Sequence, residues 1–315
     1  MISYEPLNKR LKAAGMTKTA LSAALGISSR TIAKISKGEK LSKKTLEKIA
    51  ARLGCGADEL CREISDNAIL QILRDEKDAG ISGGLYHELQ VRMTYNSNHI
   101  EGSRLTEAQT RMIFETETIP AGDGVPVDDI LETVHHFRAI DYVIDTAEAP
   151  LTEKLVKRLH YILKHDTKNA QLPWFAIGDY KKRTNLVGGR ETTKPEDVPE
   201  RMRILLEIYN ARKAVTIQDV IELHAIFEHI HPFQDGNGRV GRLIALKECL
   251  RHNIVPFLIE DAKKHFYYQG LTEWPKEKER LADVCLDGQD TFRRLLDMLG
   301  IGYGEDQISS KSVRK

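Results

Sequence analysis

The residues best suited to chemistry are gathered in one stretch, residues 231–242, which reads HPFQDGNGRVGR. His231 can accept a proton near neutral pH, and Asp235 offers the hard carboxylate oxygens that Mg²⁺ prefers beside phosphates. Arg239 and Arg242 are three residues apart, so a helix places them on one face, and their planar guanidinium groups suit phosphate oxygens. The combination predicts transfer of a phosphoryl or nucleotidyl group to an external nucleophile.

Two helices must hold this stretch. Residues 217–230 have apolar side chains at helical spacing, and Pro232 ends that helix because proline disfavours helical backbone in the residue before it. A second apolar-periodic helix runs from about residue 237 to 250. Gly236 and Gly238 lie in the loop and at the helix start, so main-chain N–H groups and the positive end of the helix dipole can hold a phosphate. The loop follows a helix and lacks G-x-x-x-x-G-K-[ST], which excludes a Walker loop and a dinucleotide fingerprint.

The segment resembles the signature of the Fic family, H-P-F-x-[DE]-G-N-G-R-x-x-R, at every fixed position. The resemblance implies a compact helical domain that transfers AMP from ATP to a Ser, Thr or Tyr hydroxyl of a target protein, with Mg²⁺ as cofactor. It implies that His231 is the general base and that Asp235 binds the metal. The nucleotide contacts that it implies in this segment are Gly236, Asn237, Gly238, Arg239, Val240, Gly241 and Arg242.

Two further segments resemble parts of that family. Residues 185–190 (NLVGGR) are the one hairpin candidate, with Gly188-Gly189 as the turn, and resemble the flap that pins an extended target segment. Tyr267 and Tyr268 resemble a pair of tyrosines on the adenine side, although packing in the core would also explain them. The residues expected over the nucleotide from the flap are Val187, Gly188, Gly189 and Arg190.

An inhibitory segment is indicated upstream. Residues 97–102 (SNHIEG) resemble the family's motif [ST]-x-x-x-E-[GN]. A helix places Ser97 and Glu101 on one face, and Gly102 is a natural helix end. The resemblance implies that Glu101 pairs with Arg242 and inhibits the enzyme, whereas an ordinary capped helix is the alternative.

The first 65 residues are basic. They hold 13 Lys and Arg against 6 Asp and Glu, whereas the whole chain has a net charge of +1, so an anionic partner is indicated for this part. About five short helices are expected, with residues 17–25 and 29–36 joined by a turn at Gly26. The expected shared core is Ala20, Leu21, Ala24, Ile27, Ile32 and Ile35.

This part resembles the Cro/repressor-type helix-turn-helix family, in the stretch TKTALSAALGISSRTIAKISKG and again in TLEKIAARLG. The resemblance implies that Ser29, Arg30, Thr31 and Lys34 face the major groove of DNA and that the protein is a homodimer. Phosphate contacts are implied for Lys18, Lys37 and Lys40. A domain kept for protein contacts is the alternative.

The fold class expected is mainly α: a helical Fic domain with a small β-hairpin flap, and a small all-α helix-turn-helix domain. The domains expected are residues 1–65 for DNA binding, 66–124 for linker helices and the inhibitory helix, 125–300 for catalysis, and 301–315 as a disordered tail. No apolar run is long enough for a membrane helix and no signal segment is apparent, so we expect a cytoplasmic protein without membrane contact. The four cysteines lack metal-site spacing and are expected to be reduced.

The function expected is that of a protein adenylyltransferase that uses ATP and Mg²⁺. One alternative is a transcription regulator whose Fic domain only senses nucleotide, but such a sensor needs no base at His231. Gly238 leaves room for the α-phosphate, which favours AMP transfer, although another nucleotide or the removal of AMP stays open.

Overall fold

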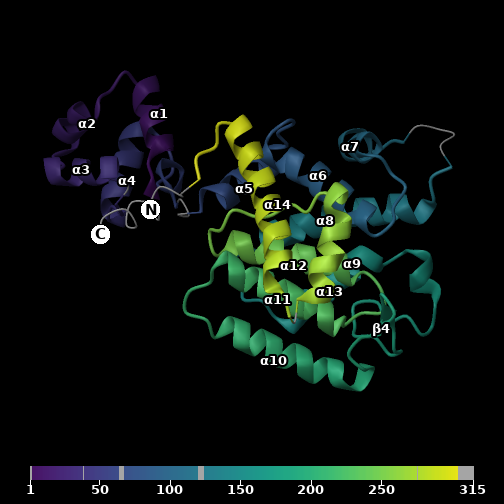
Figure 1. Ribbon diagram of the computed structural model, residues 1–315. Coiled ribbons are helices and arrows are strands. Elements are labelled where there is room, and N and C mark those ends of the chain that lie inside the picture. The colour runs from purple at the N-terminus through teal and green to yellow at the C-terminus, as the bar shows by residue number, and fades with distance from the viewer. Residues whose placement is uncertain (1, 38, 64–66, 120–123, 275, 304–315) are drawn as a thin grey trace. The chain divides into compact units, whose positions relative to one another are not determined.

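The structure is a computed structural model that describes residues 2–37, 39–63, 67–119, 124–274 and 276–303 (Figure 1). The chain divides into two compact units, residues 1–71 and 72–315, and each is described by itself. Within the described residues it forms fourteen α-helices and four strands of two residues each, so the expected mainly α fold is confirmed. Of the expected disordered tail, residues 304–315 lie outside the described residues.

The first unit is a small helical domain. Its helices are α1 (Glu5–Ala13), α2 (Lys18–Leu25), α3 (Ser29–Lys37) and α4 (Lys43–Leu53), followed by the 3₁₀ helix η1 (Asp58–Leu60). Helix α2 ends at Gly26, whose φ of 62° lies in the left-handed region that glycine adopts without steric cost. This turn leads directly into α3, as the sequence predicts.

The core of this unit differs in part from the expectation. Leu21 and Ile35 are buried and Ile27 and Ile32 are half-buried against them. Ala20 and Ala24 are exposed, so the prediction that they belong to the core is wrong. Ala20 and Ala24 are four residues apart and lie on one side of Leu21, where α2 is left at the surface.

A short strand pair closes the first unit. Strand β1 (Ile2–Ser3) pairs antiparallel with β2 (Arg62–Glu63), so the two ends of the unit lie together. Such short strands carry no readable alternation, and the sequence did not indicate them.

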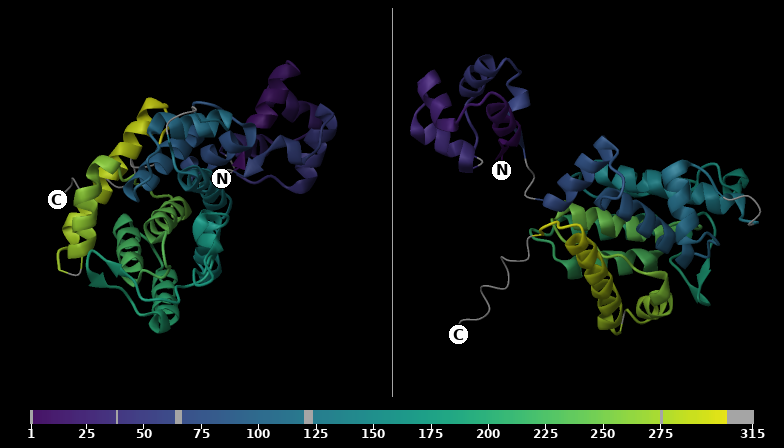
Figure 2. Two further views of the ribbon diagram at one scale, coloured as in Figure 1. Left: turned by 90° about the vertical axis from the view of Figure 1, so that its right-hand side faces the viewer. Right: turned by 90° about the horizontal axis from the view of Figure 1, so that it is seen from above.

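The second unit is a helical bundle. Its helices are α5 (Ala68–Ala79, which begins in the first unit), α6 (Leu85–Ile100), α7 (Glu107–Thr116), α8 (Val127–Asp145), α9 (Glu153–Lys164), η2 (Lys168–Gln171), η3 (Pro195–Asp197), α10 (Val198–Asn210), α11 (Ile217–Ile230), α12 (Asn237–Arg251), η4 (Asp261–Lys263), α13 (Lys264–Glu273) and α14 (Lys278–Met298). In both views of Figure 2 the green helices of the middle of the chain lie between blue-teal helices on one side and yellow helices on the other. The bundle therefore has its central layer where the chemistry-bearing residues occur.

Helix α12 is the core helix of this bundle. It contacts α6, α8, α9 and α11, and nearly all of its side chains are buried, including Arg239, Arg242 and Lys247. Charges buried this deeply must be paired, and each of these three has an acidic partner. Packing around α12 therefore decides where the arginines of the motif point.

A small hairpin stands apart from the helices. Strand β3 (Leu186–Val187) pairs antiparallel with β4 (Arg190–Glu191), with Leu186 opposite Glu191. Gly188 and Gly189 form the turn with φ values of 57° and 78°. The hairpin that the sequence predicts is present, and residues 186–189 and 191 are exposed.

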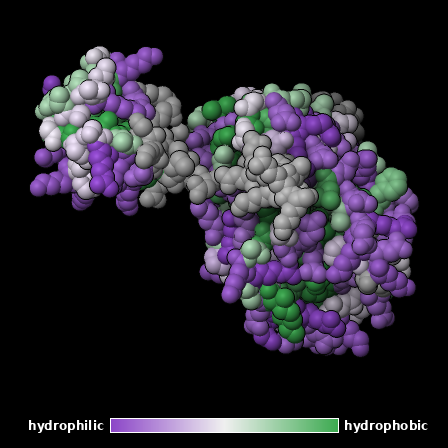
Figure 3. All heavy atoms as spheres, turned by 60° about the vertical axis from the view of Figure 1, so that its left-hand side comes forward, coloured by the Kyte–Doolittle hydropathy of each residue, from purple (hydrophilic) through white to green (hydrophobic). Residues whose placement is uncertain are grey.

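The surface is largely polar. On the face that Figure 3 shows, hydrophilic residues cover most of the second unit and are interrupted by small hydrophobic patches. None of the helices in the described part of the chain combines the length and the apolar character that crossing a membrane requires. The four cysteines are free thiols, of which Cys249 and Cys285 are buried.

Candidate active site

A short loop between α11 and α12 carries His231 and Asp235. His231 follows the last residue of α11 with a φ of 52°, a left-handed conformation that is uncommon outside glycine and often marks a functional position. Gly236 directly precedes α12 with a φ of 80°. The chain therefore turns sharply at both ends of the loop. The second turn leads directly into the first N–H groups of α12.

Asn237 holds this loop together. Its Oδ1 accepts a hydrogen bond from the main-chain N–H of Phe233 at 2.8 Å, and its Nδ2 donates to the Phe233 carbonyl at 2.9 Å. The ring of Phe233 is fully buried and stacks on His160 with ring centroids 4.0 Å apart. The side chain of Asn237, which the sequence placed among the nucleotide contacts, is thus occupied by the loop, and its main-chain N–H is what it can offer a phosphate.

Glu101 lies directly over the start of α12. Its Oε1 accepts a hydrogen bond from Nη2 of Arg242 at 2.8 Å. A Cβ atom on Gly238 would lie 2.2 Å from that same oxygen, so only glycine permits this approach. The carboxylate therefore covers the bare main chain at Gly238 as well as the guanidinium group of Arg242.

Arg242 is held from several sides. It is 4% exposed, and its guanidinium group donates to the hydroxyl and the carbonyl of Ser97, both at 2.9 Å, and to the Tyr267 hydroxyl at 3.4 Å. Ser97 and Glu101 come from the end of α6, and Gly102 follows with a φ of 100°. The segment that the sequence indicates as inhibitory, residues 97–102, thus contacts Arg242 through the side chains of Ser97 and Glu101.

A cavity of about 490 Å³ opens beside these groups. Its lining residues are Glu101, Leu186, Val187, Gly188, Glu228, His229, His231, Gly238, Arg242, Tyr267, Tyr268, Leu271 and Thr272. This volume lies in the range of small-molecule and cofactor sites. The hairpin, Glu101 and the residues of the motif therefore meet around one ligand-sized space.

His231 is uncharged at neutral pH in this setting. Burial and the charge of Lys181 lower the pKa of His231 to about 4, against the opposing effects of Glu101 and Asp235. A neutral imidazole can accept a proton, which a general base requires.

Asp235 belongs to a compact group of charges. Its Oδ2 lies 2.7 Å from Nζ of Lys164 and 3.8 Å from Nη2 of Arg239, and both cations also pair with Glu132. Burial alone would raise the pKa of Asp235, but Arg239 and Lys164 outweigh it and hold that pKa well below its usual range. The Lys164 side chain is 1% exposed whereas that of Asp235 is 46% exposed. The carboxylate is therefore held by an ion pair on its buried side and is accessible to a ligand on its exposed side.

The two tyrosines differ in their surroundings. Tyr267 is fully buried, and its hydroxyl lies 2.8 Å from Nε2 of His224 besides accepting from Arg242. Tyr268 is 38% exposed and donates to the carbonyl of Ile100 at 3.3 Å. Tyr268 therefore exposes part of its ring at the cavity. The hydroxyl of Tyr267, in contrast, is occupied by its contacts with His224 and Arg242.

Some expected contacts do not reach the cavity. Val240 is fully buried, and Gly241 packs against Glu228 and His224, where a Cβ would lie 2.4 Å from the Glu228 carboxylate. Gly189 forms the hairpin turn without lining the cavity, and the side chain of Arg190 lies outside the described residues. Arg239 is turned to Glu132 rather than to the cavity.

Three further residues of the site were not indicated by the sequence. Glu228 lines the cavity, and burial raises its pKa to about 8, partly opposed by Arg242. Lys164 and Lys181 are almost fully buried beside Asp235 and His231. Glu228 could have been noticed because it lies one helical turn before His231, but neither lysine is marked by any spacing in the sequence.

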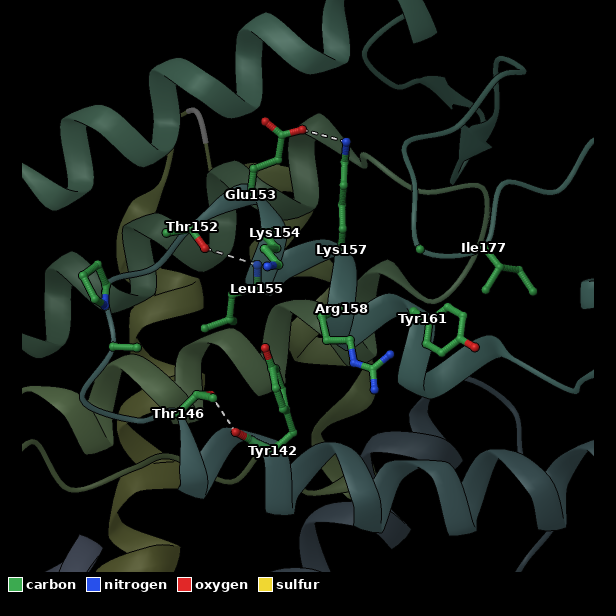
Figure 4. A pocket seen from close by; sticks show the side chains of 13 residues that line it. Tyr142, Thr146, Thr152, Glu153, Lys154, Leu155, Lys157, Arg158, Tyr161 and Ile177 are labelled. Atoms are coloured by element: carbon green, nitrogen blue, oxygen red, sulfur yellow. Dashed lines mark hydrogen bonds and ion pairs between the residues drawn. The ribbon is translucent and has the colours of Figure 1, made fainter.

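A larger pocket of about 1020 Å³ lies beside α9 and contains none of the expected site residues (Figure 4). The guanidinium group of Arg158 lies 4.9 Å from the ring centre of Tyr161, and the two stand side by side in Figure 4. Lys157 is paired with Glu153 and Asp179. The pocket combines stacked and paired side chains without a base or an anion loop, so it does not compete with the site at His231.

One cluster outside the site has metal-ligand residue types. His135, His165 and Asp166 offer ligand atoms within 4.8 Å of one another. The two imidazole rings stack with centroids 4.0 Å apart and an angle of 21° between their planes. Lone pairs of nearly parallel rings do not converge on one point, so this arrangement is ring stacking rather than a formed metal site.

The first unit presents the expected recognition face. Ser29 and Arg30, at the start of α3, are exposed, and Thr31 and Lys34 are half-exposed on the same helix. The Ser28 hydroxyl caps this helix by accepting from the N–H of Thr31 at 3.2 Å. Of the residues expected at phosphates, Lys40 is exposed and Lys18 half-exposed, and the side chain of Lys37 lies outside the described residues.

Comparison with known proteins agrees with these two units. Residues 150–249 match the profile of the Fic/DOC family, and residues 6–66 match that of the Cro/C1-type HTH DNA-binding domain. Curated relatives include the "Protein adenylyltransferase Fic" of Drosophila yakuba, 30% identical over 188 residues, and that of Aedes aegypti, 29% identical over 191 residues. Each match covers 58% of this chain and 37% of the relative, so the chain spans little more than a third of these proteins.

Solved structures show the same fold. A Fic domain containing signaling protein from Bacteroides thetaiotaomicron superposes with a TM-score of 0.59 at 21% identity, covering 74% of this chain and 99% of that one. Fic-1 from C. elegans superposes with a TM-score of 0.57 at 18% identity, covering 92% of this chain and 82% of that one. The chain thus matches the Fic/DOC family over residues 150–249 and the Cro/C1-type HTH DNA-binding domain over residues 6–66, and it shares the fold of these solved structures.

Proposed function

We propose that this chain transfers AMP from ATP to a hydroxyl group of a target protein. The observation that carries the proposal is the convergence of three features on one ligand-sized cavity: a neutral histidine, the bare helix start at Gly238, and Arg242. The name of the Drosophila and Aedes relatives, protein adenylyltransferase, supports the same activity.

The proposed reaction is an in-line displacement at the α-phosphorus of ATP. The target's hydroxyl oxygen forms a bond to that phosphorus, and its proton passes to the ring of His231. The bond between the α-phosphorus and the oxygen that bridges to the β-phosphate breaks, and pyrophosphate leaves with the electron pair. The negative charge of the bound triphosphate would raise the pKa of His231 from about 4 toward its ordinary value, which improves the base once the nucleotide is in place.

The donor set around Asp235 fits a magnesium ion. Its carboxylate is ionised, is anchored on one oxygen by Lys164 and has an open side, and Mg²⁺ is commonly bound through one carboxylate together with substrate phosphates. When bound, the ion would neutralise phosphate charge. The protein orients Asp235 for this role through the ion pair between Lys164 and the Asp235 carboxylate.

We further propose that Glu101 inhibits transfer. Its carboxylate pairs with Arg242 and covers Gly238, so it stands where phosphates of the nucleotide would lie. AMP removal, transfer of another nucleotide and nucleotide sensing remain the competing functions of the same cavity.

The decisive experiment offers the full chain four nucleotides, each labelled at the α-phosphate, with Mg²⁺ and with or without cell lysate. Label from ATP on a protein hydroxyl, located by mass spectrometry and lost in His231→Ala, is expected. Nucleotide binding without label under all conditions, also in Glu101→Gly, would favour the sensor. Loss of label from pre-labelled protein on addition of wild-type chain would favour AMP removal.

We also propose that the first unit binds duplex DNA as a homodimer, because α3 presents Ser29, Arg30, Thr31 and Lys34 outward in a basic domain. A gel shift with duplex DNA tests this. Weaker binding by Arg30→Ala with an unchanged fold supports the proposal, and absence of any shift at low salt would contradict it.

A further inference from the structure

Lys181 is a buried cation without an acidic partner. Its side chain is 2% exposed, and no carboxylate within the described residues forms an ion pair with it. Burial lowers its pKa to about 8, so it stays largely protonated at neutral pH. A buried ammonium group needs strong hydrogen-bond acceptors. The acceptors of Lys181 indicate what this residue does in the structure.

The acceptors come from both ends of the flap hairpin. Nζ of Lys181 donates to Oδ1 of Asn185 at 2.8 Å and to Oγ1 of Thr192 at 2.6 Å. Asn185 directly precedes β3, and Thr192 directly follows β4. The ammonium group therefore bridges the two chain segments that enter and leave the hairpin.

The hairpin is short, and besides Lys181 only the Thr192 hydroxyl joins its two ends through side chains within the described residues, by donating to the carbonyl and Oδ1 of Asn185 at 3.1 and 2.5 Å. Each strand has two residues, and Leu186 and Val187 are 65% and 39% exposed. An isolated two-stranded ribbon is at best marginally stable in water, even when it is longer than this one. The main-chain bond that closes it, from the Thr192 N–H to the Asn185 carbonyl, is long at 3.4 Å. Its direction in space thus depends on the stem at Lys181.

The same stem is tied to the catalytic loop. The main-chain N–H of Lys181 donates to the Pro232 carbonyl at 2.9 Å, and Nδ2 of Asn185 donates to the carbonyls of Phe233 and Gln234 at 3.2 and 3.4 Å. These three carbonyls follow His231 without a gap. A shift of the stem would therefore change the position of the flap relative to His231.

We propose that Lys181 is a positioning residue that clamps the hairpin of residues 185–192 to the loop after His231, and so fixes the height at which the flap holds a hydroxyl-bearing segment above the base. The last clause rests on the proposed transferase function, whereas the clamp itself does not. Charge and reach explain the choice of lysine. A single ammonium group can donate to two oxygens from opposite strands at once, whereas methionine would fill the same volume without donating.

The test uses Lys181→Met, Lys181→Arg and the matched control Lys182→Met, which changes the exposed neighbour. Hydrogen exchange of the free full-length chain, followed by mass spectrometry over residues 185–192, reports the clamp without any activity. We expect exchange to be at least about tenfold faster in Lys181→Met, because local opening is no longer opposed by the bridge, and near wild type in the other two variants. Unchanged exchange in Lys181→Met would overturn the proposal.

Kinetics then test the positioning role. In a Glu101→Gly background, self-labelling from α-labelled ATP should fall about 10²-fold in Lys181→Met, since a displacement of about 1 Å can cost that much. The KM for ATP should change much less, because the phosphates rest on the start of α12 rather than on the flap, and Lys181→Arg should recover most of the rate. A loss that appears wholly in the KM for ATP, or no recovery with arginine, would contradict positioning.

Two further outcomes, a variant that does not fold and a protein that takes no label, are covered by additional measurements. If Lys181→Met does not fold, Lys181→Gln decides, because its shorter polar side chain cannot reach both Oδ1 of Asn185 and Oγ1 of Thr192 while the direct contacts between these two residues stay in place. Faster flap exchange in that variant supports the clamp, and unchanged exchange overturns it. If no protein takes label from any nucleotide, the proposed function fails, whereas the exchange measurement still tests the clamp.

Discussion

Replacing Glu101 with glycine should turn the enzyme on. In the structure the Glu101 carboxylate pairs with Nη2 of Arg242 and covers the bare main chain of Gly238. Glycine removes the charge and clears the space together. Arg242 should keep its place, because its bonds to the Ser97 hydroxyl and carbonyl and to the Tyr267 hydroxyl do not involve Glu101.

The size of the effect follows from charge and position. Two like charges about 4 Å apart near a protein surface repel by about 4 kcal/mol, so the phosphates would take a displaced position rather than lie beside Glu101. A triphosphate that avoids the carboxylate is displaced by about 1 Å or more, and such a displacement costs on the order of 10²-fold in rate. We therefore expect about 10²-fold more self-labelling in Glu101→Gly, with a much smaller change in ATP affinity.

Glu101→Gln separates charge from space. The amide removes the negative charge but keeps the side chain over Gly238, so an intermediate gain of about tenfold is expected if both factors contribute. Glu107→Gln removes an exposed acid from the neighbouring helix α7 and is the matched control, which should label like wild type.

The assay is a time course of label from α-labelled ATP for all variants, with ATP affinity measured by calorimetry and folding by thermal melting. Loss of about 1 kcal/mol of stability would lower the melting temperature by about 2–4 °C, which leaves the chain folded. Arg242→Ala must not activate, since it also removes the cation expected at the γ-phosphate. Equal labelling by wild type and Glu101→Gly would show that the carboxylate does not restrain the reaction. Activation by Arg242→Ala would show that the ion pair between Glu101 and Arg242 is not the cause of the inhibition.

Three further outcomes are expected. His231→Ala should lower transfer about 10²–10⁴-fold while calorimetry still detects ATP binding, and near-normal labelling would remove the base assignment. Above pH 8 Glu228 loses its proton and adds a negative charge to the cavity, so the KM for ATP should rise with pH in wild type but stay flat in Glu228→Gln, and parallel curves for the two would contradict the raised pKa of Glu228. DNA binding by the full chain should weaken steeply between 50 and 200 mM salt, typical of about 6–10 phosphate contacts, and a salt-independent gel shift would exclude the proposed face.

The local arrangement of the site could be predicted from the sequence because it depends on neighbours along the chain. Pro232 and Gly236 set the loop between α11 and α12, and the Gly188-Gly189 pair set the hairpin. The pairing of Glu101 with Arg242, 141 residues apart, was available only through the family resemblance. Spacing alone carries no information about a contact of that range.

The remaining parts of the site follow from helix packing. Lys164 meets Asp235 because α9 packs against α12, and Lys181 meets the loop after His231 through its main-chain bond to the Pro232 carbonyl. Nothing in the residues around either lysine distinguishes it from a surface lysine in the sequence. The tyrosines show the same limit, since the pattern marked Tyr267 for a ligand and packing gave its hydroxyl to His224 and Arg242.

The charges around the cavity indicate how one carboxylate would restrain the proposed reaction. Lys164 and Arg239 are balanced by Asp235 and Glu132, and Arg242 is balanced by Glu101. Glu228 is largely uncharged at neutral pH, so it adds little to either side. A triphosphate would therefore meet a nearly neutral set of groups while Glu101 is in place. Under the proposed function, removal of Glu101 would leave the buried guanidinium group of Arg242 without its acidic partner, beside the place where phosphate charge would be held. The same removal would uncover Gly238, so attraction for the phosphates and room for them would arise together.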